Sequence, residues 1–483
     1  MKLKLAILAG VSLAVFAGGA ARAQEDPRDA LIRQLTARLD ALESQVSDLK
    51  EATAADAADV RTIVATAPQV TLTNGRPTLA TADGQLKFAV RGLVQFDAAQ
   101  YNQENKLSPN DLANGTNFRR ARLGVEGTVG KDWNYALTGE FGGSGSESAI
   151  LNQGWVEYAG WKPWNTTQAQ PLRLRIGAWA TPANLEDATS NTEGLFLERP
   201  AAAELTRSIA GGDGRTGAGA LVNGDAWYAS AVWTGSVVGA ASPAEFNEQS
   251  GYLLRAAWRP LQTPDYALHI GVNASGVTSV ADTAAGPAVT QQLRLRERPE
   301  LRVDGTRLVD TGAINASGLS QTGVELGGYF KNLYVAGETF DYKLDRTGAG
   351  KPDANFGGWY AQASWTLTKE QRLWVAANGG FRGVRPTKNF SPADGAWGAW
   401  EVAARYSYLD LNDREGTAGH ALPTNGVRGG EQRITTVGLN WYPNQTVRFL
   451  LDYQWANVER LNNAGAKIGE DFQTISLRSQ FSF

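Results

Sequence analysis

Residues 472–483, FQTISLRSQFSF, decide the fold of this chain. Ile475, Leu477, Phe481 and Phe483 fall on one phase of a two-residue period, and polar side chains fall on the other. Successive side chains of a strand point to opposite faces, so the segment predicts a strand with one apolar and one polar face. A membrane-embedded barrel closes by pairing its last strand with its first, which leaves no open edge. Because the chain ends here on an aromatic residue, we interpret the segment as the closing strand of a barrel.

The same alternation recurs from Gln85 onward. Outward phases begin or end in Trp or Tyr, as in Trp227 to Trp233 and Tyr252 to Trp258. These residues gather at the boundary between lipid and water, whereas a soluble sandwich would concentrate its aromatic residues in mid-strand. We count sixteen strands, at about 85–101, 117–129, 133–142, 150–159, 171–178, 215–223, 225–234, 249–259, 265–275, 320–330, 332–341, 355–367, 396–410, 431–442, 445–455 and 472–483.

Connection lengths support this count. Short turns alternate with long loops, the pattern of short periplasmic turns and long external loops, which places both ends of the barrel in the periplasm. Two further strand-like runs would break the parity. We place 292–298 inside an external loop and 372–381 inside one unusually long periplasmic connection. The predicted fold class is all-β, a 16-stranded antiparallel transmembrane β-barrel over 85–483, preceded by a short N-terminal periplasmic coiled-coil helix.

Composition is consistent with a barrel. The chain of 483 residues contains 54 Gly, 15 Trp, 14 Tyr and 16 Phe, and its mean hydropathy is -0.30. A porin can be this polar because every second strand residue faces water. There is no Cys, which excludes disulfides and thiol chemistry. A net charge of -3 does not suit a nucleic-acid partner.

Residues 1–23 predict a secretory signal peptide. Lys2 and Lys4 precede an apolar run that ends at Phe16, and residues 21–23 form an Ala-x-Ala cleavage site. A short membrane anchor is the alternative, although the apolar run is too short for a spanning helix. The signal predicts export, and with the barrel it predicts the outer membrane of a Gram-negative bacterium.

Residues 24–67 are charged, rich in Ala and Leu, and free of Gly. A heptad row runs along them, formed by Leu35, Leu39, Leu42, Val46 and Leu49. Two interpretations remain open: a helix that lies against the barrel, or a periplasmic coiled coil that joins several barrels. Residues 68–84 read as a linker with a short strand.

Two loops, 179–214 and 276–319, are long enough to fold into the lumen. Several arginines fall on the inward phase of the predicted strands: Arg91, Arg120, Arg122, Arg173, Arg175, Arg255 and Arg448. Arg294, Arg296 and Arg298 alternate with other residues in the second loop and would share one face if that run were extended. Guanidinium groups bind phosphate or carboxylate through paired planar hydrogen bonds, so a row of them predicts an anion path. The alternative is that these arginines pair with lumen acids and hold the wall.

From about residue 85 to its end, the chain resembles the phosphate-selective porin family of the O/P type. The likeness is carried by NFRRARLGVEG (117–127), LEDATSNTEGLFLERP (185–200), RERPELRVDGTRLVDTG (296–312), GAWEVAARYSYLDL (398–411) and GGEQRITTVGLNWYPNQTVRFLLDY (429–453). The resemblance implies a trimeric sixteen-stranded outer-membrane channel. It maps the family's pore arginines onto Arg119, Arg120 and the group Arg294, Arg296 and Arg298, and the inward-folded third loop onto 179–214.

The chain departs from the family at its constriction. Phosphate-specific members carry two lysines at the positions of Asp187 and Thr192, and an arginine at the position of Leu93. Arg91 lies two residues earlier on the same face. An acid beside the path weakens a dianion site, so we expect phosphate specificity to be relaxed or lost. The loop residues expected at the constriction are Asp187, Thr192, Glu193, Arg199 and Arg207.

Other classes of function fit less well. The only histidines, His269 and His420, have no neighbours that suggest a catalytic triad, and nothing in the sequence predicts a metal or cofactor site. A structural or adhesive role would need larger external domains. The sequence therefore predicts a passive, anion-preferring porin for phosphate, polyphosphate or similar small anions, and not an enzyme. The alternative is a weakly selective porin for small hydrophilic solutes. The expected partners of this protein are outer-membrane lipid and further copies of the chain in a homotrimer.

Overall fold

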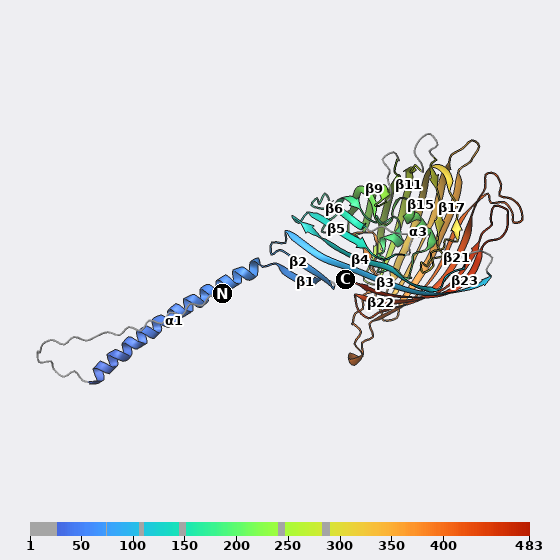
Figure 1. The fold of residues 1–483 in the computed structure, drawn as a ribbon. Coiled ribbons are helices and arrows are strands. Elements are labelled where there is room, and N and C mark those ends of the chain that lie inside the picture. Colours follow the sequence, from blue (N-terminus) through green and yellow to red (C-terminus); the bar gives the residue numbers. More distant parts are fainter. Residues whose placement is uncertain (1–26, 74, 106–110, 144–150, 240–246, 283–289) are drawn as a thin grey trace, which may run out of the picture. The chain divides into compact units, whose positions relative to one another are not determined.

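The computed structural model describes residues 27–73, 75–105, 111–143, 151–239, 247–282 and 290–483 (Figure 1). The chain divides into two units, Met1–Ala67 and Pro68–Phe483, which are described separately. The expected signal peptide lies outside the described residues. In the described part of the chain, no helix is long and apolar enough to cross a membrane.

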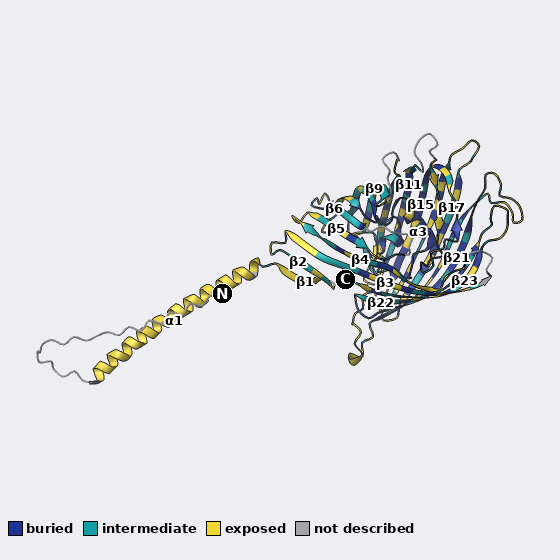
Figure 2. Ribbon diagram, in the orientation of Figure 1, coloured by how far each residue is buried: buried dark blue, intermediate teal, exposed yellow. Residues whose placement is uncertain are grey.

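The first unit contains one helix, α1 (Pro27–Thr66), of 40 residues. It extends through the Ala-rich stretch and ends two residues before Pro68, as the sequence predicts. Apolar side chains of the heptad row are all exposed, among them Leu35, Leu42 and Leu49 (Figure 2). An isolated helix gains no hydrophobic stabilisation from an exposed row of this kind.

The second unit is a closed antiparallel barrel of sixteen strands. Each strand pairs with its neighbours in sequence, and the last strand pairs with the first (Figure 1). The strands are β3 (Leu86–Asn105), β4 (Gly115–Val129), β5 (Trp133–Glu140), β6 (Leu151–Tyr158), β7 (Leu172–Ala178), β8 (Arg215–Asn223), β9 (Trp227–Val237), β10 (Ser250–Gln262), β11 (Tyr266–Ser279), β15 (Ile314–Phe330), β16 (Leu333–Arg346), β17 (Ala354–Thr366), β20 (Ala399–Asp413), β21 (Val427–Tyr442), β22 (Val447–Glu459) and β23 (Glu470–Ser482). The predicted sixteen-stranded antiparallel barrel, its strand positions and the presence of an N-terminal helix are confirmed.

The barrel closes where β23 meets β3. The pairing ends at Ser482 opposite Leu93, and beyond it Phe483 and Gly92 exchange two backbone hydrogen bonds of 3.0 Å. A hairpin of β1 (Gln69–Thr73) and β2 (Arg76–Ala80) then pairs with the start of β3. Most of the segment expected to be a linker is therefore sheet. We call the end of the barrel that carries Leu86 and Phe483 the terminus end, and the opposite end the loop end.

The glycine at position 92 leaves room for the ring of Phe483 at the closing pair of strands. A Cβ atom there would lie 2.3 Å from Cε1 and 2.4 Å from Cζ of Phe483. We expect Gly92→Val to displace the terminal ring at a cost of roughly 1–3 kcal/mol, as for other overpacked sites. Heat-modified migration on electrophoresis should then occur at a lower temperature than in the wild type. Gly115→Val on β4 is the control, because a Cβ at Gly115 has no atom within 4 Å; equal shifts for both variants would contradict the closure argument.

The outer face carries two aligned rows of aromatic residues. On β9 and β10, Trp227 lies opposite Trp258, and Trp233 lies opposite Tyr252. The residues between them are small or apolar, which is the pattern of a lipid-facing band between two interfacial girdles.

Part of the lumen is filled by the loop between β7 and β8. It contains α2 (Leu185–Ala188) and α3 (Ala201–Ala210). Helix α3 packs against the inner face of the barrel from β10 to β20, and Leu205 belongs to one core with Tyr342 and Leu409. The loop creates a hydrophobic core inside the barrel that strand alternation did not predict.

Two further connections enter the lumen. Between β11 and β15 lie β12 (Gln292–Leu293), β13 (Arg296–Glu297) and β14 (Val309–Asp310). Between β17 and β20, at the terminus end, lie the hairpin β18 (Trp374–Val375) and β19 (Gly380–Phe381) and the 3-10 helix η1 (Pro392–Asp394). The two strand-like runs, 292–298 and 372–381, add no strand to the sixteen of the barrel. The predicted even number of barrel strands therefore holds.

Candidate channel constriction

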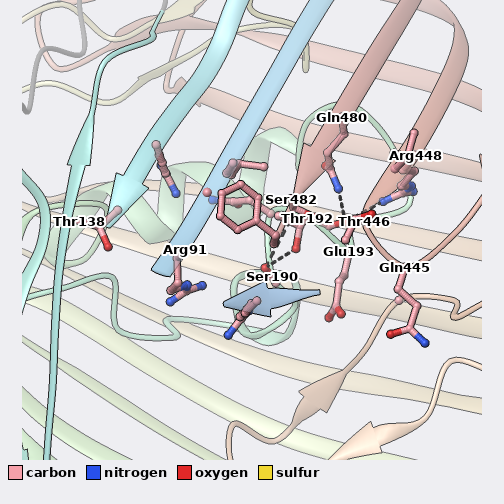
Figure 3. A pocket seen from close by; sticks show the side chains of 18 of the residues that line it. Arg91, Thr138, Ser190, Thr192, Glu193, Gln445, Thr446, Arg448, Gln480 and Ser482 are labelled. Carbon is pink, nitrogen blue, oxygen red and sulfur yellow. Dashed lines mark hydrogen bonds between the residues drawn. The ribbon is translucent and has the colours of Figure 1, made fainter. Parts of the chain in front are cut away.

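Two neighbouring cavities lie in the described part of the lumen. The terminus-end cavity has a volume of about 450 Å³ and is lined by Arg91, Ser190, Thr192, Glu193 and Arg448, among others (Figure 3). The loop-end cavity has a volume of about 370 Å³. Four residues line both cavities: Arg122, Asn152, Arg207 and Asp213. We call these four residues the throat.

Ion pairs link the charged residues of the throat. Asp213 accepts from Arg122 Nη2 at 2.6 Å and from Arg207 Nη2 at 2.5 Å. Arg122 also pairs with Glu140 on the adjacent strand. One carboxylate therefore bridges the wall strand β4 and the loop helix α3, and an anion that passes must compete with it for both guanidinium groups.

Asp187, the acid expected to oppose anions, is paired. Its Oδ1 lies 2.8 Å from Arg207 Nε and 3.2 Å from Arg199 Nη2. The carboxylate lies at α2, whose N-terminus is capped by Asn184. Two arginines neutralise this acid, so the charge reversal inferred from the sequence is compensated within the same loop.

Thr192 and Glu193 lie on the terminus-end cavity (Figure 3). The backbone oxygen of Thr192 accepts from Gln480 Nε2 at 3.0 Å and from Arg448 Nη1 at 3.3 Å. The Glu193 carboxylate pairs with Arg385 Nη2 at 3.2 Å. These contacts fix the tip of the loop between the wall and the connection 367–398.

The predicted wall arginines differ in their positions. Arg91 lines the terminus-end cavity and pairs with Glu126 at 2.8 Å, beside the inward-facing Leu93. Arg175 pairs with Glu157 at 2.7 Å, and Arg173 donates to a backbone oxygen of the connection 367–398. Of these three, Arg91 alone lines either of the two cavities described above.

A β-bulge explains why two consecutive arginines both point inward. Arg120 lies opposite Gln95 and Phe118 lies opposite Phe96, so Arg119 is the extra residue. Arg119 and Arg120 are both buried, and Arg119 Nε donates to Glu198 Oε1 at 2.7 Å. Strand alternation places only Arg120 on the inward phase. The family resemblance named Arg119 as well.

The arginines of the second loop do not form a single row. Arg294 is exposed and donates to Asp310 Oδ1 at 2.7 Å, and Arg296 is also exposed. Arg298 is buried and lines the loop-end cavity. The extended run ends at Glu297, and Glu300 then adopts a left-handed conformation with φ 57°. Alternation therefore does not continue to Arg298.

Sequence reasoning missed the role of the connection 367–398, which supports the constriction loop from the terminus end. Asn378 Nδ2 donates to the Ala188 oxygen at 2.8 Å, and Arg372 Nη1 donates to the Glu193 oxygen at 2.8 Å. Arg372 also pairs with Glu401 at 2.7 Å, while Arg255 donates to backbone oxygens of the hairpin tip. The Gly-rich run at 379–383 is the one sequence signal of this close packing.

Arginines outnumber side-chain carboxylates around both cavities. The terminus-end cavity is lined by seven arginines (Arg76, Arg91, Arg122, Arg199, Arg207, Arg385, Arg448) and three acids (Asp187, Glu193, Asp213). The loop-end cavity is lined by seven arginines (Arg119, Arg122, Arg207, Arg215, Arg298, Arg302, Arg307) and four acids (Glu140, Glu204, Asp213, Glu297).

Protonation changes this balance. Burial acts to raise the pKa of Glu204, but Arg207, Arg302 and Arg199 outweigh burial and lower that pKa to about 2. Burial raises the pKa of Glu297 to about 7, against the opposing effect of Arg302. Glu297 therefore loses its negative charge as the pH falls below neutrality, and the loop-end cavity becomes more positive.

Comparison with known proteins agrees with this architecture. The family described as phosphate-selective porin O and P matches residues 88–483. The chain belongs to this porin family. Membership makes the protein an outer-membrane channel of Gram-negative bacteria rather than an enzyme.

Two curated relatives are similar along most of the chain. Porin O of Pseudomonas aeruginosa is 27% identical over 424 residues, 85% of this chain and 92% of the relative. An uncharacterized protein of Caulobacter vibrioides is 28% identical over 428 residues, 84% of this chain and 78% of the relative.

The solved structures that match this chain do so with low sequence identity and TM-scores below 0.5. OmpT of Vibrio cholerae has a TM-score of 0.47 at 10% identity, covering 83% of this chain and 98% of that protein. An anion-selective porin from Comamonas acidovorans has a TM-score of 0.47 at 12% identity, covering 82% and 100% respectively.

Proposed function

We propose that this porin is a passive, anion-preferring channel whose phosphate specificity is relaxed. The observation that supports the proposal most directly is the excess of arginines over acids around both cavities. An excess of fixed positive charge in a narrow lumen attracts anions and raises the energy of cations. In this proposal, arginines of the barrel wall and of the constriction loop attract anions together, although they do not form one continuous row.

Relaxed specificity follows from the throat. A phosphate dianion that enters must approach Asp213, which already holds Arg122 and Arg207. Tight binding of phosphate requires guanidinium groups that are available for paired hydrogen bonds, and at the throat Arg122 and Arg207 are already paired with Asp213. Phosphate, polyphosphate and similar small anions are therefore expected to pass without a tight binding site.

The experiment is a planar-bilayer measurement of purified protein. In a KCl gradient we expect a reversal potential that reports anion preference, with chloride current reduced by phosphate only at high concentration. A reversal potential close to zero would favour the alternative, a weakly selective porin for small hydrophilic solutes. Cation preference would contradict the proposal, and block by micromolar phosphate would show that phosphate specificity is retained.

We also propose that the protein is a homotrimer joined by a parallel coiled coil of α1 in the periplasm, with the barrel termini on the same side. The exposed row Leu35, Leu39 and Leu42 has the heptad spacing that such a coil requires. Arg38 and Glu43 flank this row five residues apart, the spacing at which neighbouring parallel helices pair opposite charges.

Disruption of the heptad row tests the coiled coil. We expect Leu42→Asp to place charges in the interface and to reduce the thermal stability of the trimer, measured by the loss of the trimer band on heating. Ala41→Asp is the matched control, because it adds the same charge one position away from the row. If the trimer of Leu42→Asp is as stable to heating as that of the wild type, contacts between the barrels alone would account for oligomerisation.

A further inference from the structure

The carboxylate of Glu198 lies at the centre of four guanidinium groups. Arg119 contacts it at 2.7 Å and 3.3 Å, and Arg478 Nη2 lies 2.9 Å from Oε1. Arg302 Nε and Arg120 Nη2 lie 3.6 Å and 3.9 Å from Oε2. We call Arg119, Arg120, Arg302 and Arg478 the arginine cluster. Three separate segments supply it, so the cluster exists only in the folded barrel.

Other carboxylates, Asp97 and Glu204 among them, pair with single members of the arginine cluster. Asp97 pairs with Arg478 at 2.6 Å, and Glu204 pairs with Arg302 at 2.8 Å. Glu204 also forms ion pairs with Arg207 and Arg199. Glu198 is the one carboxylate that all four arginines approach. Its removal would leave several guanidinium groups in a buried place without a shared counterion.

Glu198 is held in its ionised form. Burial acts to raise the pKa of Glu198, but Arg119, Arg120, Arg478 and Arg302 outweigh burial and hold this pKa well below its usual range. The planar forks of several arginines around one pair of oxygens match the way proteins bind phosphate and sulfate. The geometry is that of an oxyanion site occupied by the chain's own side chain.

The arginine cluster borders the path of solutes. Arg119 and Arg302 line the loop-end cavity of about 370 Å³, while Glu198 belongs to the constriction loop. An anion that arrives from the loop end therefore meets these two arginines next to a carboxylate that already occupies them.

We propose that Glu198 is a tethered anion that fills an oxyanion site formed by the arginine cluster. It holds the constriction loop to β4 and β23 and excludes free phosphate or sulfate from this part of the lumen. The importance of this site for conduction rests on the proposed anion channel, but occupancy of the site is a binding property and can be tested without conduction.

The test compares Glu198→Ala with the wild type in the full-length protein. Temperatures of heat modification are measured in phosphate and in chloride at equal ionic strength. For Glu198→Ala we expect phosphate, and sulfate likewise, to raise this temperature by at least about 3 °C over chloride, as ligand binding to the folded state does. The wild type should show no such difference. Glu193→Ala is the matched control, since Glu193 lies in the same loop but pairs outside the cluster with Arg385.

An equal response of all three proteins would overturn the proposal, since it would show a general salt effect. If Glu198→Ala folds in neither buffer, the same comparison on Glu198→Ser decides. This variant also removes the charge and empties the site, but it keeps a hydroxyl group that can accept a hydrogen bond from a guanidinium group, and an identical response to phosphate and chloride would again overturn the proposal. The bilayer experiment distinguishes the two proposals, because cation preference of the wild type together with phosphate stabilisation of Glu198→Ala would contradict only the anion channel.

Discussion

Excision of the hairpin tip 374–381 should widen the channel more than any single substitution. The backbone N of Arg382 donates to the Leu373 oxygen at 3.0 Å, so an Asn-Gly turn can join these two residues directly. The excision removes the Asn378 contact to the constriction loop, and Phe381, which packs in one core with Leu185 of α2. We expect the single-channel conductance to rise at least about twofold, because the segment that fills the lumen at the terminus end is gone.

The control shortens the same connection at an exposed place. Residues 392–395 lie between Ser391 and Ala396, which already bridge each other, and none of the four is buried. Replacement of this turn by two glycines should leave conductance unchanged. If the folded variant without residues 374–381 has the same conductance as the wild type, the narrowest point of the channel lies at the throat and not at the hairpin.

Asp213→Asn should give the largest change in ion selectivity. The carboxylate bridges Arg122 and Arg207 where the two cavities meet, so its neutralisation removes one negative charge from the path, while Arg122 keeps Glu140 and Arg207 keeps Asp187 as partners. A unit charge a few ångströms from the path acts strongly on a passing ion, and partial exposure of Asp213 and salt weaken the effect. We expect a roughly fivefold to tenfold increase in the anion-to-cation permeability ratio. Block of the chloride current by phosphate should appear at lower concentrations than in the wild type.

Asp394→Asn is the matched control for this substitution. Asp394 lies in the exposed 3-10 helix η1 and lines neither cavity, so the same change of charge should leave the reversal potential unaltered. If Asp213→Asn also leaves it unaltered, ions do not pass between Arg122 and Arg207.

The sequence predicted the barrel wall well because alternation is a local signal. Every predicted strand is present, including β8 at 215–223 with identical bounds, and the two extra runs lie in connections as expected. Each lipid-facing residue must be apolar whatever happens inside the lumen, so a two-residue period and terminal aromatic residues suffice to place the strands. The inward fold of 179–214 came from family resemblance combined with loop length.

The lumen could not be predicted in the same way. Tyr342 and Leu409 are inward-facing residues of the wall, yet they form a hydrophobic core with α3. Alternation identifies which face a residue occupies but not whether water or another segment covers that face. The insertion of the hairpin 374–381 escaped prediction for this reason, because its buried contacts are made with distant strands and leave no periodic pattern in its own sequence.

The sequence by itself therefore determined the strand count, the membrane-facing band and the antiparallel order of the strands. Only the tertiary structure decided which carboxylate each arginine meets. Asp187 changed from an isolated acid to a partner of Arg199 and Arg207, and Glu198 became the counterion shared by four arginines. The physical reason is that charge pairing depends on distances of a few ångströms between segments far apart in the chain, whereas strand formation depends on neighbours along it.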